Sequence, residues 1–135
     1  MMRKHTAWVI GALLTSTSAF AEVVNIDNAE LVRLQAKGVP VVDIRTPEEW
    51  RETGVIKGAR LMTYSFSGGF DKAAWLKQVQ QVAKPGEPVI LVCRSGRRSA
   101  AVADYLESQS GQGKIYNASG GMNAWKSSGR PVVAP

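Results

Sequence analysis

A run of apolar residues, a short loop and a helix-forming segment follow one another in the middle of the chain. Residues 89–92 are Val-Ile-Leu-Val, the pattern of a short strand that is buried on both faces. Residues 99–107 carry apolar side chains at helical spacing and predict a helix. Residues 93–98 join the two. Because strands buried on both faces belong to parallel sheets covered by helices, this junction predicts an α/β fold.

The connecting loop combines the chain's one cysteine with three arginines, Arg94, Arg97 and Arg98. Backbone N–H groups at a helix N-terminus converge on one point and favour negative charge. Gly96 leaves the backbone free to curl its N–H groups inward. An inert buried cysteine and a solvated arginine pair are the alternative interpretation. Three arginines on one short loop repel each other unless water or an anion screens them, so we expect a thiolate-favouring Cys93 within an anion site.

The N-terminus has the pattern of a secretory signal peptide. Two basic residues precede an uncharged apolar segment, residues 6–20, and Ala19-Phe20-Ala21 forms a cleavage site with small residues at its ends. A membrane anchor is the alternative, but this segment is shorter than the roughly 20 residues that cross a bilayer. We expect residues 1–21 to be cleaved, residues 22–135 to form the mature domain without stable membrane insertion, and the protein to be periplasmic in a Gram-negative source.

Charge and composition limit the partners of the mature chain. It keeps 15 basic and 11 acidic side chains and no long basic tract, so a small anionic substrate is favoured over nucleic acid. The only histidine, His5, lies in the predicted signal peptide. We therefore expect no Cys–His catalytic pair, no metal and no cofactor. A single cysteine excludes an intramolecular disulfide and marks a reactive thiol or an intermolecular cross-link. A monomer is the default expectation.

Strands and helices alternate on both sides of the central junction. This alternation predicts a single α/β domain whose mostly parallel sheet is flanked by helices on both faces. Residues 63–70, rich in Ser and Gly, are expected to form a flexible connecting loop. The expected strands are residues 23–26, 39–45, 89–92 and 114–117, with a further short strand after a turn within residues 55–62. The expected helices are residues 28–36, 47–53, 72–83, 99–110 and 122–126.

Asp43 and Arg45 stand at the carboxyl end of an otherwise apolar strand. In open α/β sheets, ligands gather at the carboxyl ends of the strands. The two residues are therefore placed to support a site. An ordinary ion pair is an equally good interpretation of the two charges, and it is compatible with that role.

Three motifs, in this order and spacing, resemble the single-domain rhodanese family of thiosulfate sulfurtransferases. Residues 42–59 resemble the family's D-V-R-x-x-x-E-[FYW]-x-x-G-H-I-x-G-A stretch, with Val55 where the family often has a structural His. Cys93–Ser99 is similar to the family's active-site loop, and residues 120–125 resemble its G-G-x-x-A-W ending. Together the motifs cover nearly all of the mature chain.

The resemblance implies a function for the loop. Cys93 would take sulfane sulfur from an anionic donor such as thiosulfate, hold it as a persulfide, and pass it to a thiophilic acceptor such as cyanide or a thiol. Asp43 and Arg45 would support the loop from the neighbouring strand. Such a reaction needs donors for negative charge but no general base, which agrees with the lack of histidine. The implied substrate-binding residues are Arg94, Ser95, Gly96, Arg97, Arg98 and Ser99. Among them, the side chains of Arg94 and Arg98 are the main ones that would bind the anionic sulfur donor.

Three other functions stay open at this point. Cysteine-dependent phosphatases and arsenate reductases of a related fold place an Arg six residues after the Cys. Here Ser99 stands at that position and Arg98 comes one residue earlier, so the loop fits a sulfur atom better than a tetrahedral phosphate. A non-catalytic rhodanese-like binding module is the second alternative, although inactive members typically lack the cysteine. A sulfur-relay protein that works only when docked to a partner is the third.

Overall fold

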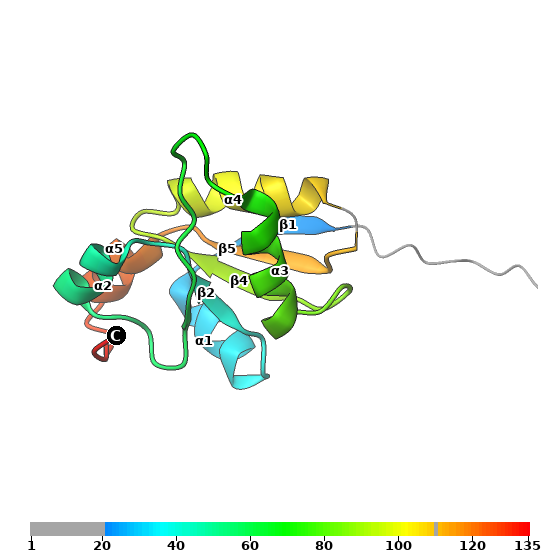
Figure 1. The fold of residues 1–135 in the computed structure, drawn as a ribbon. Helices are drawn as coiled ribbons and strands as arrows, with labels where there is room; N and C mark the ends of the chain where they lie inside the picture. Colours follow the sequence, from blue (N-terminus) through cyan, green and yellow to red (C-terminus); the bar gives the residue numbers. More distant parts are fainter. Residues whose placement is uncertain (1–20, 110) are drawn as a thin grey trace, which may run out of the picture.

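A sheet of five parallel strands forms the centre of the computed structural model, which describes residues 21–109 and 111–135 (Figure 1). The strands follow the order β1-β5-β4-β2-β3 across the sheet. The strands are β1 (Glu22–Ile26), β2 (Val41–Asp43), β3 (Arg60–Leu61), β4 (Val89–Val92) and β5 (Lys114–Ala118). The helices are α1 (Asn28–Ala36), α2 (Pro47–Thr53), α3 (Lys72–Val82), α4 (Arg97–Ser108) and α5 (Gly121–Ser127).

The helices cover both faces of the sheet, which confirms the predicted α/β fold. Successive residues of β4 point to opposite faces, so Leu91 and Cys93 pack with α3 and α4, whereas Ile90 and Val92 pack with α1 and α5. The helical side chains that form these two cores are Trp75, Val79, Val102 and Leu106 on the first face and Leu31, Leu34, Met122 and Trp125 on the second.

The strand β4 occupies the position that its sequence predicts. It lies between β2 and β5, and all four of its residues are buried. In the parallel pairing with β2, Val92 lies opposite Asp43. The carboxyl ends of the two strands therefore meet at one edge of the sheet, and Cys93 follows directly after that edge. The helices α2 and α5 lie side by side at the same end (Figure 1).

The helix α4 begins at Arg97, two residues before the predicted start at Ser99. Gly96 takes the N-cap position with φ of 90°, a left-handed conformation that glycine adopts without strain. The loop is therefore shorter than predicted, and Arg97 and Arg98 belong to the first turn of α4. Residue 110, the predicted end of this helix, lies outside the described residues.

The segment of residues 63–70 is a connecting loop, as predicted, but its first half is packed. Tyr64 is buried, and its ring lies 5.1 Å from that of Phe66, 4.9 Å from that of Phe70 and 5.0 Å from that of Trp75. Aromatic pairs at such separations attract each other beyond the area that they bury. The cluster fixes this loop to α3.

The predicted signal peptide lies outside the described residues except for Ala21. The first strand begins at Glu22, directly after the predicted cleavage site, and this residue forms the first pair of β1 with β5, opposite Lys114. Within residues 21–109 and 111–135, none of the helices has the length and apolar character needed to cross a bilayer.

Candidate active site

The sulfur of Cys93 accepts hydrogen bonds from the loop that follows it. The N–H of Gly96 lies 3.1 Å from Sγ and the N–H of Ser99 lies 3.3 Å from it. The hydroxyl oxygen of Ser99 also lies 3.2 Å from the same sulfur. Cys93 is buried, so the two N–H groups replace water around it. Converging N–H groups at a helix N-terminus favour negative charge on the sulfur, as the sequence predicts. We call the N–H groups of Gly96 and Ser99 the cradle of Cys93.

The close packing of the loop requires glycine at two positions. A Cβ at Gly96 would collide with the backbone carbonyl of Ser119. A Cβ at Gly121, where φ is 57°, would collide with the carbonyls of Cys93 and Arg94. Backbone segments from β5 and α5 thus approach the loop more closely than any side chain would allow.

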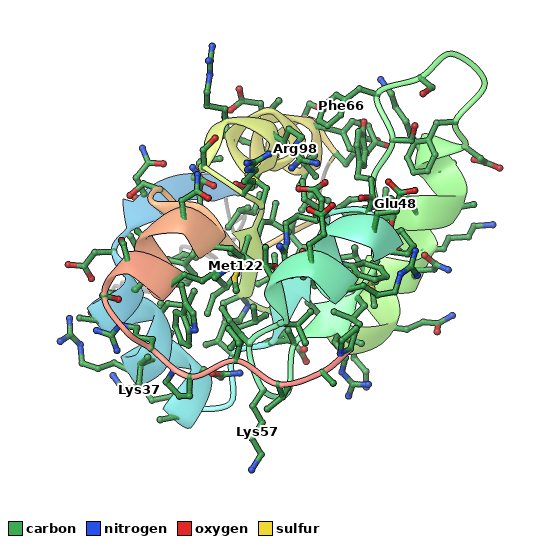
Figure 2. All side chains as sticks on the ribbon, turned by 90° about the vertical axis from the view of Figure 1, so that its left-hand side faces the viewer. Lys37, Glu48, Lys57, Phe66, Arg98 and Met122 are labelled. Atoms are coloured by element: carbon green, nitrogen blue, oxygen red, sulfur yellow. The ribbon has the colours of Figure 1, made fainter. Side chains whose placement is uncertain are left out.

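The start of α5, where Figure 2 labels Met122, is bonded to the backbone of the loop. The N–H of Met122 donates to the carbonyl of Cys93 at 2.9 Å, and the N–H of Asn123 donates to the carbonyl of Arg94 at 2.9 Å. These bonds use helix-terminal N–H groups that lack partners within their own helix. Gly121, the first residue of α5, permits this approach because its Cβ would meet the same two carbonyls, a role that the motif alone did not reveal.

Arg98 forms a bidentate ion pair with Glu49 of α2. Its Nη1 and Nη2 atoms lie 2.8 and 2.6 Å from the two carboxylate oxygens. The hydrogen bond from Arg98 lowers the pKa of Glu49 from its usual 4.5 to about 2, and the same contact raises the pKa of Arg98. Sequence reasoning missed Glu49 as a site residue. Its place in the first family motif was the one available signal.

Asp43 and Arg45 form the ion pair that their charges suggested. Both are fully buried, with Nη2 and Oδ2 2.8 Å apart. Arg45 also donates to the hydroxyl of Thr53 at 2.6 Å and to the carbonyl of Gly54 at 3.0 Å. These bonds tie the end of β2 to the end of α2. Ile44, which stands between Asp43 and Arg45, donates its N–H to the carbonyl of Val92 at 3.1 Å, directly before Cys93.

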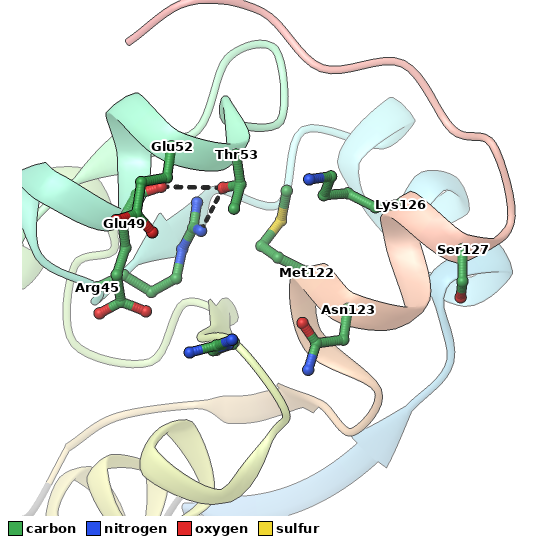
Figure 3. A pocket seen from close by; sticks show the side chains of 9 residues that line it. Arg45, Glu49, Glu52, Thr53, Met122, Asn123, Lys126 and Ser127 are labelled. Carbon is green, nitrogen blue, oxygen red and sulfur yellow. Dashed lines mark hydrogen bonds between the residues drawn. The ribbon is translucent and has the colours of Figure 1, made fainter.

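A cavity of about 440 Å³ lies between α2 and α5 beside the loop (Figure 3). Glu52 and Thr53 line it from α2, and Met122 and Lys126 line it from α5. Of the loop residues, Arg94 lines it and is exposed. Ser95 and Arg97 are also exposed at the surface. Of the loop arginines, Arg94 therefore lines the cavity, whereas the charge of Arg98 is paired with Glu49.

A family model described as a rhodanese-like domain matches residues 27–128 of the chain. The chain belongs to the rhodanese family. It is 27% identical to thiosulfate sulfurtransferase 18 of Arabidopsis thaliana over 124 residues, which cover 88% of this chain and 90% of the relative. It is 33% identical to a sulfurtransferase of Allochromatium vinosum over 97 residues, covering 72% of this chain and 80% of the relative.

Solved structures share the fold. A rhodanese-like domain protein from Staphylococcus aureus superposes with a TM-score of 0.58 at 29% identity, covering 84% of this chain and 99% of that one. A solved protein of M. tuberculosis superposes with a TM-score of 0.63 at 24% identity, covering 85% and 99%. The rhodanese family and its sulfurtransferase members support sulfur transfer as the general activity of this chain.

Proposed function

We propose that this rhodanese moves sulfane sulfur from an anionic donor such as thiosulfate to a thiophilic acceptor through a persulfide on Cys93. The observation that carries the proposal is the hydrogen-bonding of the Cys93 sulfur by the N–H groups of Gly96 and Ser99. Donors that are fixed before the reaction stabilise an anionic sulfur without reorganisation.

The first half of the reaction loads the cysteine. The Cys93 thiolate attacks the outer sulfur of thiosulfate, and a sulfur–sulfur bond forms at Sγ. The bond between the outer sulfur and the sulfite sulfur breaks, and its electron pair leaves with sulfite. The persulfide keeps one negative charge. No proton is transferred in this step, so it proceeds without a general base.

The second half of the reaction discharges the cysteine. Cyanide attacks the outer sulfur of the persulfide, thiocyanate leaves, and the thiolate of Cys93 is restored with its electron pair. A thiolate acceptor reacts in the same way and leaves as a persulfide. The acceptor therefore needs direct access to the outer sulfur, and the cavity between α2 and α5 provides space next to the loop.

The loading step brings a dianion to an anionic thiolate, so cations near the sulfur are needed to offset the repulsion. Arg94 is the loop cation that both lines the cavity and is exposed. Arg97, exposed on the first turn of α4, is a second candidate. The guanidinium of Arg98 is bound by Glu49. We therefore assign the main donor contact to Arg94.

Turnover of the purified domain tests the proposal. With thiosulfate and cyanide and no other protein, the wild-type chain should release sulfite and thiocyanate in equal amounts, and Cys93→Ser should release neither. Absence of turnover by a folded, reduced wild-type chain would reject the free enzyme and favour a binding module or a docked relay protein. Hydrolysis of p-nitrophenyl phosphate in place of sulfur transfer would favour the phosphatase alternative.

A further inference from the structure

Asn117 of β5 lies in the interior next to the cysteine loop, and both the nitrogen and the oxygen of its side-chain amide form hydrogen bonds. Its Nδ2 donates to the carbonyl of Gly96 at 3.2 Å and to Oδ1 of Asn25 at 3.0 Å. Its Oδ1 accepts from the hydroxyl of Ser99 at 2.6 Å. Because a backbone carbonyl can only accept, the contact with Gly96 fixes which end of the amide is nitrogen. The oxygen therefore faces Ser99.

The Ser99 hydroxyl lies between two acceptors. Its oxygen is 2.6 Å from Oδ1 of Asn117 and 3.2 Å from Sγ of Cys93. A hydroxyl has one hydrogen, and an amide oxygen has none. The contact with Asn117 therefore uses the hydrogen of Ser99 and turns the lone pairs of its oxygen towards the sulfur. A protonated Cys93 can donate its S–H to these lone pairs, which completes a chain of bonds from sulfur to hydroxyl to amide.

A thiolate changes this arrangement. It carries no hydrogen, so the lone pairs of Ser99 would face a negative sulfur. The hydroxyl gains a bond to the thiolate only when it turns its hydrogen away from Asn117. That turn leaves the amide oxygen without its donor, and Asn117 is only 3% exposed to solvent. A buried acceptor without a partner is costly, so the bond gained at sulfur is offset by the bond lost at Asn117.

We propose that Asn117 is a positioning residue that competes with the Cys93 sulfur for the hydroxyl hydrogen of Ser99 and thereby limits the thiolate. Asn117 acts against the N–H groups of Gly96 and Ser99, which favour the thiolate. The inference rests on the proposed function in that the thiolate is the attacking form, and it adds the residue that sets how much of this form is present.

The charged groups on the elements around the sulfur are the same in every variant that tests this inference. They include Arg94 on the loop, Arg97 and Arg98 on α4, Asp43 on β2 with its partner Arg45, Glu49 and Glu52 on α2, and Lys126 on α5. Since none of them is substituted, a change in the thiolate fraction is assigned to the hydrogen of Ser99.

The test measures the thiolate of Cys93 directly. Because the chain has one cysteine, the ultraviolet absorbance of the thiolate, with Cys93→Ser subtracted, reports this residue alone. At a pH where the wild-type chain is mostly thiol, Asn117→Ala should raise the thiolate fraction about threefold, the effect of one hydrogen bond. Asn117→Val, which suits a strand, serves as a second variant if the alanine chain does not fold. An unchanged or lower thiolate fraction in the folded variant would overturn the inference.

Two controls separate this competition from a loosened loop. Asn25→Ala removes an acceptor of the same amide but leaves the bond between Ser99 and Asn117 in place, so the thiolate fraction should stay at the wild-type value. In a Ser99→Ala chain no hydrogen is left to share, so adding Asn117→Ala should cause no further rise. A rise as large as in the wild-type background would contradict the inference. The absorbance needs no sulfur donor, so a chain that behaves as expected here but takes up no sulfur would reject only the proposed function.

Discussion

Glu49 on α2 and Arg98 on α4 are 49 positions apart in sequence, yet they join the two helices through a bidentate ion pair beside the reactive cysteine. The pair has two consequences. It anchors the first turn of α4, whose two arginines would otherwise be unfavourable at the positive end of the helix dipole. It also removes one cation from the set that is free to bind an anionic donor.

Releasing Arg98 should therefore improve donor binding. Glu49→Gln keeps the size of the side chain but removes its charge, so the guanidinium of Arg98 gains freedom to attract thiosulfate. We expect KM for thiosulfate to fall about threefold, as for one partly exposed charge contact. Steady-state kinetics with an uncharged sulfane-sulfur donor provide the control, since its KM should not change. An unchanged KM for both donors would show that the charge of Arg98 does not reach the donor.

The same pair makes part of the stability pH-dependent. The pKa of Glu49 is depressed in the folded chain to about 2 from its usual 4.5. The contribution of the pair is therefore complete above about pH 4.5 and is lost as pH falls through about 2. Both side chains are partly exposed, so solvent screening limits the contribution to about 1 kcal/mol. In urea unfolding, the free energy of unfolding of wild type should exceed that of Glu49→Gln by this amount at neutral pH, and the difference should shrink as pH falls from about 4.5 to 2. A constant difference would contradict the assignment.

Arg94 and Arg98 should differ in their effect on the donor. Arg94→Ala removes an exposed cation from the cavity while the backbone carbonyl of residue 94 keeps its bond from Asn123. We expect KM for thiosulfate to rise about tenfold, the value of a charge-assisted hydrogen bond. Arg98→Ala should raise it less, because Glu49 already neutralises that charge. Equal effects of the two substitutions would place both arginines at the donor.

Gly96 should tolerate no side chain, and Gly86 offers a matched control. Both have φ near 90°, but a Cβ at Gly96 meets the backbone of Ser119, whereas a Cβ at Gly86 meets nothing within 4 Å. Gly86→Ala should cost only the conformational strain, about 1 kcal/mol. Gly96→Ala should lower the free energy of unfolding by about 3 kcal/mol or more and reduce sulfur loading. Similar unfolding free energies for the two variants would show that the close approach is unimportant.

Export is the remaining proposal about the chain. Cleavage after Ala21 would leave β1 whole, because that strand begins at Glu22. We expect the intact mass of the protein recovered from the periplasmic fraction of a Gram-negative host to match residues 22–135. Replacing both basic residues near the start, Arg3 and Lys4, with Ser should reduce export. A full-length chain in the cytoplasm would contradict this proposal.

The order of strands and helices could be predicted because it depends on local patterns. The four apolar residues of β4 predicted a buried strand. The expected helix starts at residues 28, 47 and 72 match the structure, in which Asp27, Thr46 and Asp71 cap these helices. The predicted start of α4 was two residues too late, because Arg97 and Arg98 do not belong to the apolar pattern of the helix. Their place in the helix depends on Gly96 and on the contact with Glu49, and neither is visible in the spacing of apolar residues.

The cysteine and its cradle could also be predicted, because a strand, a glycine and a helix follow directly in sequence. The partners that hold the cradle come from elsewhere in the chain. Asn117 lies 18 residues from Ser99, and the arginine that pairs with Asp43 also bonds to the end of α2. Such contacts arise from the packing of β5 and α2 against the loop, which a single sequence does not reveal.

Intact mass spectrometry of residues 22–135 is the decisive measurement for the persulfide on Cys93. After incubation with thiosulfate, we expect the wild-type chain to gain the mass of one sulfur atom and to lose it on addition of cyanide, and Cys93→Ser never to acquire it. No gain by a chain whose Cys93 thiol is free and reduced would contradict the persulfide mechanism.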